Sequence, residues 1–305
     1  MPIGKQLDDY EYNNEQNKIS TAKNETAFLP EEPKYSLDEV ILPAKVKEEV
    51  LDAADYAKYS QLVFEVWGLQ KTHKYSKNLG INLYGPSGTG KTMTAHAIAN
   101  HLHRKILTVN YAEIESKYVG ETSKNICRIF ETAKETHSIL FFDEADAFLS
   151  RRVTNMAESR DVSVNQTRSV LLMCLNDYQD FVIFATNFIS NFDPAFMRRI
   201  AVQIKFEMPD YECRKKLWQQ SIPQEMPNDI DIESLAEKYE GVSGSDIHNA
   251  VKIAAFKAAR RQDVIVRQSY VEEAVEAILA SKRDNERKNI TVSERKVPEE
   301  YAQFS

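Results

Sequence analysis

Eight consecutive residues combine three of the nine glycines of this chain with a lysine and a threonine. The spacing G-x-x-x-x-G-K-T, between a strand-like run and a helix-like run, is typical of a loop that binds phosphate. Glycines let successive backbone N–H groups point inward, the lysine reaches the β- and γ-phosphates, and the threonine hydroxyl binds Mg²⁺. The pattern predicts a nucleoside triphosphate site formed by Gly85, Pro86, Ser87, Gly88, Thr89, Gly90, Lys91, Thr92 and Met93.

Acidic and amide side chains follow two other apolar runs. Asp143 and Glu144 come directly after residues 139–142, and Asn187 ends the next apolar run. We expect Asp143 to hold Mg²⁺ together with Thr92, and Glu144 to orient and deprotonate the attacking water. The amide of Asn187 can hydrogen-bond the γ-phosphate and the same water. Such residues at strand ends can also be surface or turn residues, and the glycine-rich loop upstream favours the catalytic interpretation.

Two adjacent arginines, Arg198 and Arg199, lie between that run and the next apolar alternation. Such pairs are usually solvated surface charges or phosphate contacts. Here they also fit a finger that crosses into the site of a neighbouring subunit and stabilises the charge of a transition state. This interpretation requires an oligomer, and it leaves open which of the two arginines reaches the nucleotide.

Strand-like and helix-like runs alternate along most of the chain, and these elements must position the site. Continuous apolar strands separated by helices indicate a parallel sheet covered on both faces, with ligands at the carboxyl ends of the strands. We expect strands at 81–84, 106–109, 139–142, 181–185 and about 202–206, with helices at 92–102, 126–133 and 164–175. Beyond residue 209 the pattern is purely helical, over roughly 210–221, 231–240, 245–261 and 269–281.

The predicted fold class is therefore α/β, a parallel sheet sandwiched by helices and followed by a small all-α domain. We expect a disordered acidic tail over residues 1–33, a large α/β domain over 34–209, the helical domain over 210–281 and a charged tail over 282–305. The capping-box pattern formed by Ser36 and Glu39 predicts that a helix opens there.

Composition excludes several classes of protein. A net charge of −7 and a sequence pI of about 5.6 argue against a nucleic-acid partner bound through its phosphates. No apolar run approaches the roughly 18 residues of a membrane span, and the first residues lack the apolar core of a signal peptide. We therefore expect a cytoplasmic protein without a membrane anchor. His96, His101 and His103 fit no chelating pattern, and we expect them at the surface.

Together these motifs, within Tyr35–Ser281, resemble the AAA+ ATPases, and among them those that remodel proteins. Gly85–Thr92 is similar to their Walker A motif, Phe141–Glu144 to their Walker B motif, and Asn187 to their sensor 1. The resemblance implies the P-loop NTPase fold with a helical lid, and ATP and Mg²⁺ as cofactors. It also implies a ring of identical subunits, a hexamer, that couples ATP hydrolysis to remodelling of a polypeptide substrate, with the adjacent arginines as fingers.

Two further segments carry the same resemblance. Val40 and Ile41 lie in a segment similar to the one that packs on adenine, and Gly244 and Ser245 in one similar to the lid motif that closes over ribose and base. The Gly-Ser-Asp form of the lid motif resembles the meiotic clade, which includes spastin, katanin, the ATPases that disassemble ESCRT-III and the mitochondrial outer-membrane dislocases. The pachytene-checkpoint ATPases, which act on HORMA-type partners, are a further resemblance.

The segment with Lys117, Tyr118 and Val119 is similar to the first pore loop of this family, where aromatic rings grip a threaded polypeptide. A tyrosine on a glycine-hinged loop offers a broad contact surface of low conformational entropy, which suits side chains of any sequence. An ordinary core tyrosine is the alternative. A second, arginine-bearing loop is expected between Arg151 and Asp161.

The chain departs from the family pattern at Ser87, where a second proline is usual, and after Asn187, where a common Arg-Pro pair is missing. Two other functions stay open. One is a switch or scaffold that assembles on ATP and recruits partners without threading; it predicts that Tyr118→Ala leaves function intact. The other is a DNA-acting clamp loader, which the acidic balance disfavours. The sequence does not identify the polypeptide substrate.

Overall fold

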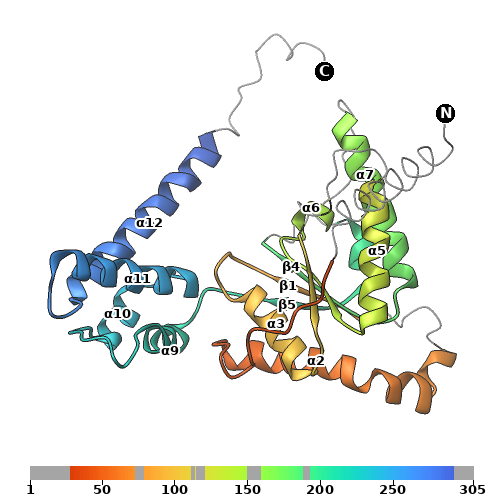
Figure 1. Cartoon of the computed structure of the whole chain (residues 1–305), viewed down its shortest axis with the longest axis horizontal. Helices are drawn as coiled ribbons and strands as arrows, with labels where there is room; N and C mark the ends of the chain where they lie inside the picture. Colours follow the sequence, from red (N-terminus) through yellow and green to blue (C-terminus); the bar gives the residue numbers. More distant parts are fainter. Residues whose placement is uncertain are drawn as a thin grey trace, which may run out of the picture.

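The computed structural model describes residues 28–72, 79–110, 114, 121–149, 159–187 and 193–291. An α/β part and a smaller helical part stand next to each other, joined by a single connection after the last strand (Figure 1). The pore-loop candidates Lys117, Tyr118 and Val119 lie outside the described residues, as does most of the expected second loop.

Five parallel strands form the centre of the α/β part, in the order β2-β3-β4-β1-β5. Their bounds are β1 Leu79–Tyr84, β2 Ile106–Val109, β3 Ile139–Phe142, β4 Phe181–Thr186 and β5 Ile200–Lys205. The sheet confirms the predicted fold class, with the fifth strand beginning earlier than expected. Because β3, β4 and β1 are neighbours, the residues that follow these three strands meet at one edge of the sheet.

Helices cover both faces of the sheet (Figure 1). One face carries α2 Ala44–Gln61 and α3 Lys91–His101, with the π-helical η1 Leu62–Val66 and the 3₁₀-helical η2 Leu69–Lys71 after α2. The other face carries α5 Glu121–Thr136, α6 Asp146–Leu149, α7 Ser159–Asp177 and α8 Pro194–Met197. Buried strand residues alternate between the two faces, as the two-residue period of a strand requires.

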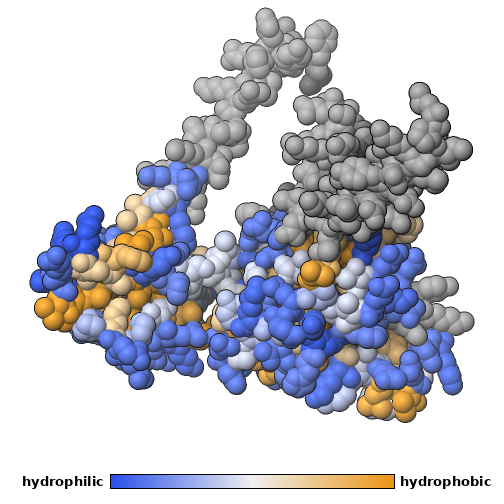
Figure 2. Space-filling model, viewed as in Figure 1, coloured by the Kyte–Doolittle hydropathy of each residue, from blue (hydrophilic) through white to orange (hydrophobic). Residues whose placement is uncertain are grey.

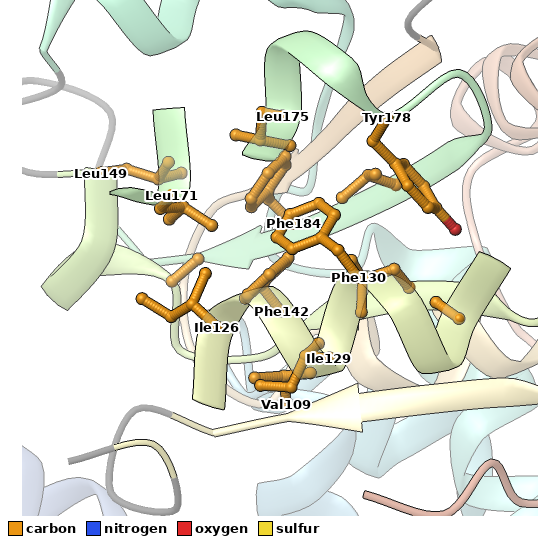
Figure 3. Packing of buried hydrophobic residues seen from close by; sticks show 14 of the residues in the cluster. Val109, Ile126, Ile129, Phe130, Phe142, Leu149, Leu171, Leu175, Tyr178 and Phe184 are labelled. Carbon is orange, nitrogen blue, oxygen red and sulfur yellow. The ribbon is translucent and has the colours of Figure 1, made fainter. Parts of the chain in front are cut away.

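Aromatic packing connects the sheet to α5 (Figure 3). The rings of Phe142 and Phe184 stack with centroids 5.2 Å apart, and Phe130 of α5 lies 6.1 Å from Phe142 and 5.2 Å from Tyr178. Such contacts contribute roughly 0.5–1.5 kcal/mol each beyond area burial. Because Phe142 directly precedes Asp143, this core fixes the strand end that carries the acidic pair.

The helical part consists of α9 Tyr211–Ser221, α10 Ile232–Lys238, α11 Gly244–Arg261 and α12 Gln268–Thr291. Its helices surround the fully buried Trp218. Side-chain carboxylates of Asp210 and Asp231 accept backbone N–H groups at the starts of α9 and α10, which is why these helices begin there. None of the described helices combines the length and the apolar character that a membrane crossing requires.

Both ends of the described chain differ from expectation. Residues 28–33, expected in the tail, pack against the fold: Glu31 and Ile106 exchange backbone hydrogen bonds of 2.8 and 2.9 Å along the sheet edge. An edge strand has free backbone groups, and this segment pairs with them. At the other end α12 continues from Ser281 through Thr291, and Lys282 bonds to Asp246 of α11.

The expected helix start at Ser36 is also corrected. Glu39 accepts hydrogen bonds from Ser36 N at 2.7 Å and from its hydroxyl at 2.9 Å, so the capping contacts form. They close only a turn, because the chain then passes Pro43 and the helix α2 begins at Ala44.

Candidate active site

The glycine-rich loop connects β1 to α3, as its spacing predicts. Gly85, Gly88 and Gly90 have φ values of +141°, +78° and +98°, a region that favours glycine. A Cβ on Gly85 would lie 2.0 Å from the carbonyl oxygen of Phe206, so no larger residue fits. The glycines are therefore required by backbone shape and by close approach to the neighbouring segment.

Lys91 begins α3 and is buried. Its Nζ donates to the carbonyl oxygens of Gly85 at 2.7 Å and Pro86 at 2.9 Å, and to Asn187 Oδ1 at 3.0 Å. Burial lowers the pKa of Lys91, while the nearby carboxylates, Asp143 first, act to raise it. The anionic oxygens of a phosphate are stronger hydrogen-bond acceptors than these neutral oxygens. A bound phosphate would therefore draw the Lys91 ammonium away from its present acceptors.

Thr92 and Asp143 supply a pair of oxygens suited to a hard cation. Thr92 Oγ1 donates to Asp143 Oδ2 at 2.9 Å. In an octahedral Mg²⁺ site with bonds of about 2.0–2.1 Å, neighbouring ligands lie about 2.9 Å apart. The donor set and its spacing fit Mg²⁺.

Glu144 follows Asp143 with a φ of +48°, an uncommon value for a residue other than glycine. Its N–H donates to Asp143 Oδ1 at 2.9 Å, which holds this backbone turn, and its side chain is exposed. Uncommon backbone conformations are kept where the surroundings over-determine them, often at active sites. The turn leaves the Glu144 carboxylate free to meet a water molecule in the cleft.

Asp146 is a positioning residue that the sequence analysis missed. It begins α6, and its Oδ2 accepts the backbone N–H of Asn187 at 3.0 Å. Asn187 is therefore held at two points, its side-chain amide oxygen by Lys91 and its backbone N–H by Asp146. In the sequence, Asp146 could have been recognised as the third acidic residue of the run Asp143-Glu144-Ala145-Asp146.

The phosphate loop, the acidic pair and Asn187 line a cleft of about 770 Å³. The cleft lies between the carboxyl ends of the strands, the helical part and the segment before α2. Sites for small molecules commonly measure 300–1,000 Å³, so a nucleotide fits. The predicted residues that line the cleft are Val40, Ile41, Ser87, Gly88, Thr89, Gly90, Lys91, Thr92, Met93, Asp143, Glu144, Asn187, Gly244 and Ser245. Tyr35, Leu217, His248 and Asn249 line it too and were not predicted, because none of them lies within a motif that the sequence analysis identified.

The helical part touches the phosphate loop directly. Ser245 N donates to Gly88 O at 3.3 Å, and a Cβ on Gly88 would lie 2.6 Å from Ser243 Oγ. Ser243 and Asp246 form a capping box at the start of α11. Burial acts to raise the pKa of Asp246, but hydrogen bonds from Lys282 and Ser243 lower it overall, so the cap is anionic.

Gly88→Ala should weaken ATP binding about tenfold, or roughly 1.4 kcal/mol, because the added methyl group would displace Ser243. Titration of a fluorescent ATP analogue measures this. Gly241→Ala is the matched control, since Gly241 has a similar φ of +75° with nothing within 4 Å of an added Cβ. If Gly88→Ala and Gly241→Ala bound the ATP analogue with equal affinity, the contact between the helical part and the phosphate loop would have no role in ATP binding.

Arg198 and Arg199 lie away from this cleft. Arg199 precedes β5, and a Cβ on Gly80, at the start of β1, would lie 2.8 Å from the Arg199 carbonyl oxygen. Gly85 and the phosphate loop follow the other end of β1, about 16 Å away at 3.3 Å per residue. Arg199 donates to Asn176 Oδ1 at 2.5 Å and to the Ala195 carbonyl, whereas Arg198 is exposed. Neither arginine is placed to reach the nucleotide cleft of its own chain.

His96, expected at the surface, is instead buried on α3. Its ring meets Tyr35 and Phe141 edge-on, with centroids 6.1 and 6.4 Å away. Burial lowers the pKa of His96, although Glu31 acts to raise it. The surface prediction for His96 was wrong because the segment before α2, which includes Tyr35, covers this side of α3. The sequence around His96 gives no sign of that contact.

Comparison with known proteins agrees with this geometry. The family model described as "ATPase family associated with various cellular activities (AAA)" matches residues 81–208, and the "AAA+ lid domain" model matches residues 229–273. The 26S proteasome regulatory subunit 8 homolog of Schizosaccharomyces pombe is 38% identical over 208 residues, which cover 66% of this chain and 52% of the relative.

Two other relatives match longer segments. The proteasome-activating nucleotidase of Archaeoglobus fulgidus is 31% identical over 86% of this chain and 67% of the relative. The ATP-dependent zinc metalloprotease FtsH of Helicobacter pylori is 30% identical over 88% of this chain and 42% of the relative. The chain spans about half the length of most of the curated relatives it matches. With an AAA domain, an AAA+ lid domain and a phosphate-loop cleft between them, the chain belongs to the AAA family of ATPases.

Proposed function

We propose that this chain hydrolyses Mg-ATP in a ring of identical copies, a hexamer, and uses the energy to remodel a polypeptide substrate. One observation carries the proposal: a phosphate loop, a cation-binding oxygen pair, a carboxylate and an amide meet at the ends of three adjacent strands. These are the parts that hydrolysis of a phosphoanhydride needs. The residues are Lys91, Thr92, Asp143, Glu144 and Asn187.

Each residue has one task in the proposed reaction. Lys91 exchanges its carbonyl acceptors for oxygens of the β- and γ-phosphates and offsets their charge. Thr92 and Asp143 hold Mg²⁺, which supplies further positive charge against the phosphate oxygens when bound. Glu144 accepts the proton of the attacking water, and Asn187 orients that water through its amide.

Action between copies is supported by the position of Arg198. Hydrolysis develops charge on the γ-phosphate that an arginine can stabilise, and such an arginine can increase the rate by about 10³–10⁵. Arg198 is exposed at the amino-terminal end of the sheet, far from the phosphate loop of its own chain. A second copy is therefore the natural recipient of this side chain, whereas Arg199 is engaged by Asn176.

The aromatic core between β3 and α5 supports coupling to a polypeptide. Phe142 precedes the acidic pair, and Phe130 packs on it from α5. Tyr118 lies three residues before the start of α5 at Glu121. A shift of β3 during the nucleotide cycle would thus be transmitted to the segment that carries Tyr118. The names of the relatives, a proteasome subunit, a proteasome-activating nucleotidase and an ATP-dependent protease, also point to polypeptide substrates.

Finer assignments rest on single features. The Gly-Ser-Asp run that opens α11 supports the meiotic clade. Within the class of protein remodellers, the substrate is a filament, a membrane protein or a HORMA-type partner, and the sequence does not decide among these three. We place the boundary between the large domain and the lid at Pro209, where β5 has ended and α9 has not begun. Residues 28–33 belong with the large domain, and α12 as far as Thr291 belongs with the lid.

Tyr118→Ala should abolish polypeptide processing while most ATP turnover persists, because the aromatic contact with the substrate is lost and the nucleotide cleft is not. The assay follows ATP-dependent unfolding of a fluorescent protein that carries an unstructured extension. Tyr118→Phe, which keeps the ring, is the matched control and should process the substrate. A Tyr118→Ala variant that unfolds the substrate at the wild-type rate would instead favour the switch or scaffold function.

A further inference from the structure

Two of the three cysteines of this chain lie side by side in the fold, although their sequence positions differ by 47. Cys127 is on α5 and Cys174 is on α7, and their Sγ atoms are 3.7 Å apart. A disulfide bond has an S–S distance of about 2.05 Å, so the two sulfurs must approach by about 1.7 Å to form one. Rotation of the two side chains and a small shift of the helices supply such a movement.

The helices that carry the two thiols share one core. Ile126 of α5 and Leu171 and Leu175 of α7 lie in the same buried cluster, and Cys174 packs against it (Figure 3). Close-packed side chains hold the helices in place, because a core of this density deforms little. The short distance between the two sulfurs is therefore a property of the packed fold.

Exposure separates these two cysteines from the third. Cys127 and Cys174 are partly exposed, whereas Cys213 on α9 is buried. Where Figure 2 shows described residues of the α/β part, their surface is mostly hydrophilic, so water and small polar solutes surround this part. Because oxidation of a cysteine depends on its exposure, we expect a small oxidant to reach Cys127 and Cys174 before it reaches Cys213.

We propose that Cys127 and Cys174 form a modification site, at which hydrogen peroxide converts the two thiols to a disulfide that links α5 to α7. A dithiol reductant restores the two thiols. The site is separate from the nucleotide chemistry, because neither cysteine is among the described residues that line the cleft. The segment between the two cysteines contains β3 and the acidic pair, so the new bond would close a loop around them.

The reaction has two steps. In the first, the thiolate of Cys127 attacks one oxygen of the peroxide, the O–O bond breaks, and a sulfenic acid forms while hydroxide leaves. In the second, the sulfur of Cys174 attacks the sulfur of Cys127, the S–S bond forms, and the S–O bond breaks with loss of a second hydroxide. The two thiol protons convert both hydroxides to water. Each sulfur gives up one electron, and the peroxide takes up both.

The order of the two sulfurs follows from their surroundings. Burial and the neighbouring thiol of Cys127 raise the pKa of Cys174 to about 12, so its thiolate is scarce at neutral pH. The thiolate is the form that attacks a peroxide. We therefore assign the first attack to Cys127 and the second to Cys174, whose thiol already touches the sulfur that it must reach.

The disulfide would act on the coupling between ATP and the polypeptide, a consequence that rests on the proposed function. In that proposal, a shift of β3 reaches the segment with Tyr118 through α5. A covalent bond to α7 would restrain α5, while the cleft stays free to bind ATP. The oxidised chain should therefore bind ATP normally and process polypeptide more slowly.

Mass spectrometry of a non-reducing digest tests the bond itself. The full-length chain is reduced, freed of reductant and treated with hydrogen peroxide. Most chains should then yield a linked peptide that contains Cys127 and Cys174 and that dithiothreitol separates. Cys213→Ser is the matched control, because it removes the third thiol and should still yield the linked peptide. Thiols that stay reduced, that pair only between copies or that oxidise to sulfinic acid would overturn the site.

Unfolding of a fluorescent protein that carries an unstructured extension tests the consequence. Peroxide should slow the wild type at least about fivefold, a coupling of ordinary size, and leave binding of a fluorescent ATP analogue unchanged. Cys127→Ser, treated in the same way, is the matched control, since it cannot form the bond and should keep its rate. Equal slowing of both chains would overturn the effect on coupling, because other oxidised residues would then explain it.

The two proposals fail in different ways. A reduced wild-type chain that binds ATP but processes no polypeptide would overturn the proposed function, and the linked peptide would still support the modification site. A reduced chain that processes polypeptide but yields no linked peptide after peroxide would overturn the site alone.

Discussion

Glu144→Gln should reduce steady-state ATP turnover at least about 100-fold and leave ATP binding near the wild-type level. Glutamine keeps the size of the side chain but cannot accept the proton of the attacking water. The residues that hold the phosphates, Lys91 and the loop, are untouched by this change. A phosphate-release assay measures turnover, and titration of a fluorescent ATP analogue measures binding.

Glu135→Gln is the matched control for that experiment, because Glu135 is an exposed carboxylate on α5 away from the cleft. It should turn over ATP like the wild type. Retention of more than half of the wild-type turnover in Glu144→Gln would show that another group accepts the proton. The exposed side chain and the left-handed backbone of Glu144 would then need a different explanation.

Arg198→Ala should lower turnover about 1,000-fold while the chain still binds ATP, since an arginine that acts in the transition state contributes about 10³–10⁵ in rate. The loss follows from removing a charge that the neighbouring site needs. Arg199→Ala should behave differently, because its guanidinium bonds to Asn176 and Ala195 within the same chain. That variant should lose about 1–2 kcal/mol of stability, visible as a lower Tm.

The comparison of the two arginine variants is informative because both remove the same charge from adjacent positions. Turnover per folded molecule separates the catalytic role from the structural one. If Arg199→Ala lost turnover and Arg198→Ala did not, the assignment of the two side chains would be reversed.

The nucleotide cleft could be predicted from the sequence because its chemistry is local. The loop from Gly85 to Thr92 has a spacing that few other structures require, and the acidic pair and Asn187 each follow an apolar run. Because parallel strands share one carboxyl end of the sheet, the fold class predicts that these residues lie at that end, whereas the adjacency of β1, β3 and β4 is known only from the structure. The strand positions could also be predicted, because a continuous apolar run is a local feature of the sequence.

Contacts between distant segments could not be predicted. Glu31 pairs with Ile106, and Tyr35 covers His96, although each pair is separated by more than 60 residues. A composition rich in charge suggested a tail at residues 28–33, but a free sheet edge supplied backbone partners that composition does not reveal. The contact of Ser243 with the phosphate loop depends likewise on how the lid packs.

The two arginines illustrate the same limit at short range. Their sequence positions differ by one residue, and nothing in the local pattern distinguishes them. In the fold, Arg199 turns toward Asn176 at the end of α7, and Arg198 faces outward. Only the three-dimensional placement shows that both lie about 16 Å, the length of β1, from the phosphate loop of their own chain.

That one copy supplies the arginine and another copy the cleft is a claim that mixing two inactive variants can test. Glu144→Gln lacks the proton acceptor but keeps Arg198, and Arg198→Ala lacks the arginine but keeps Glu144. In mixed rings, some interfaces join an intact Glu144 to an intact Arg198. We predict that ATP turnover reappears on mixing and is greatest near equal amounts. Turnover that stays at the sum of the separate variants, although differently tagged copies co-purify, would contradict the claim.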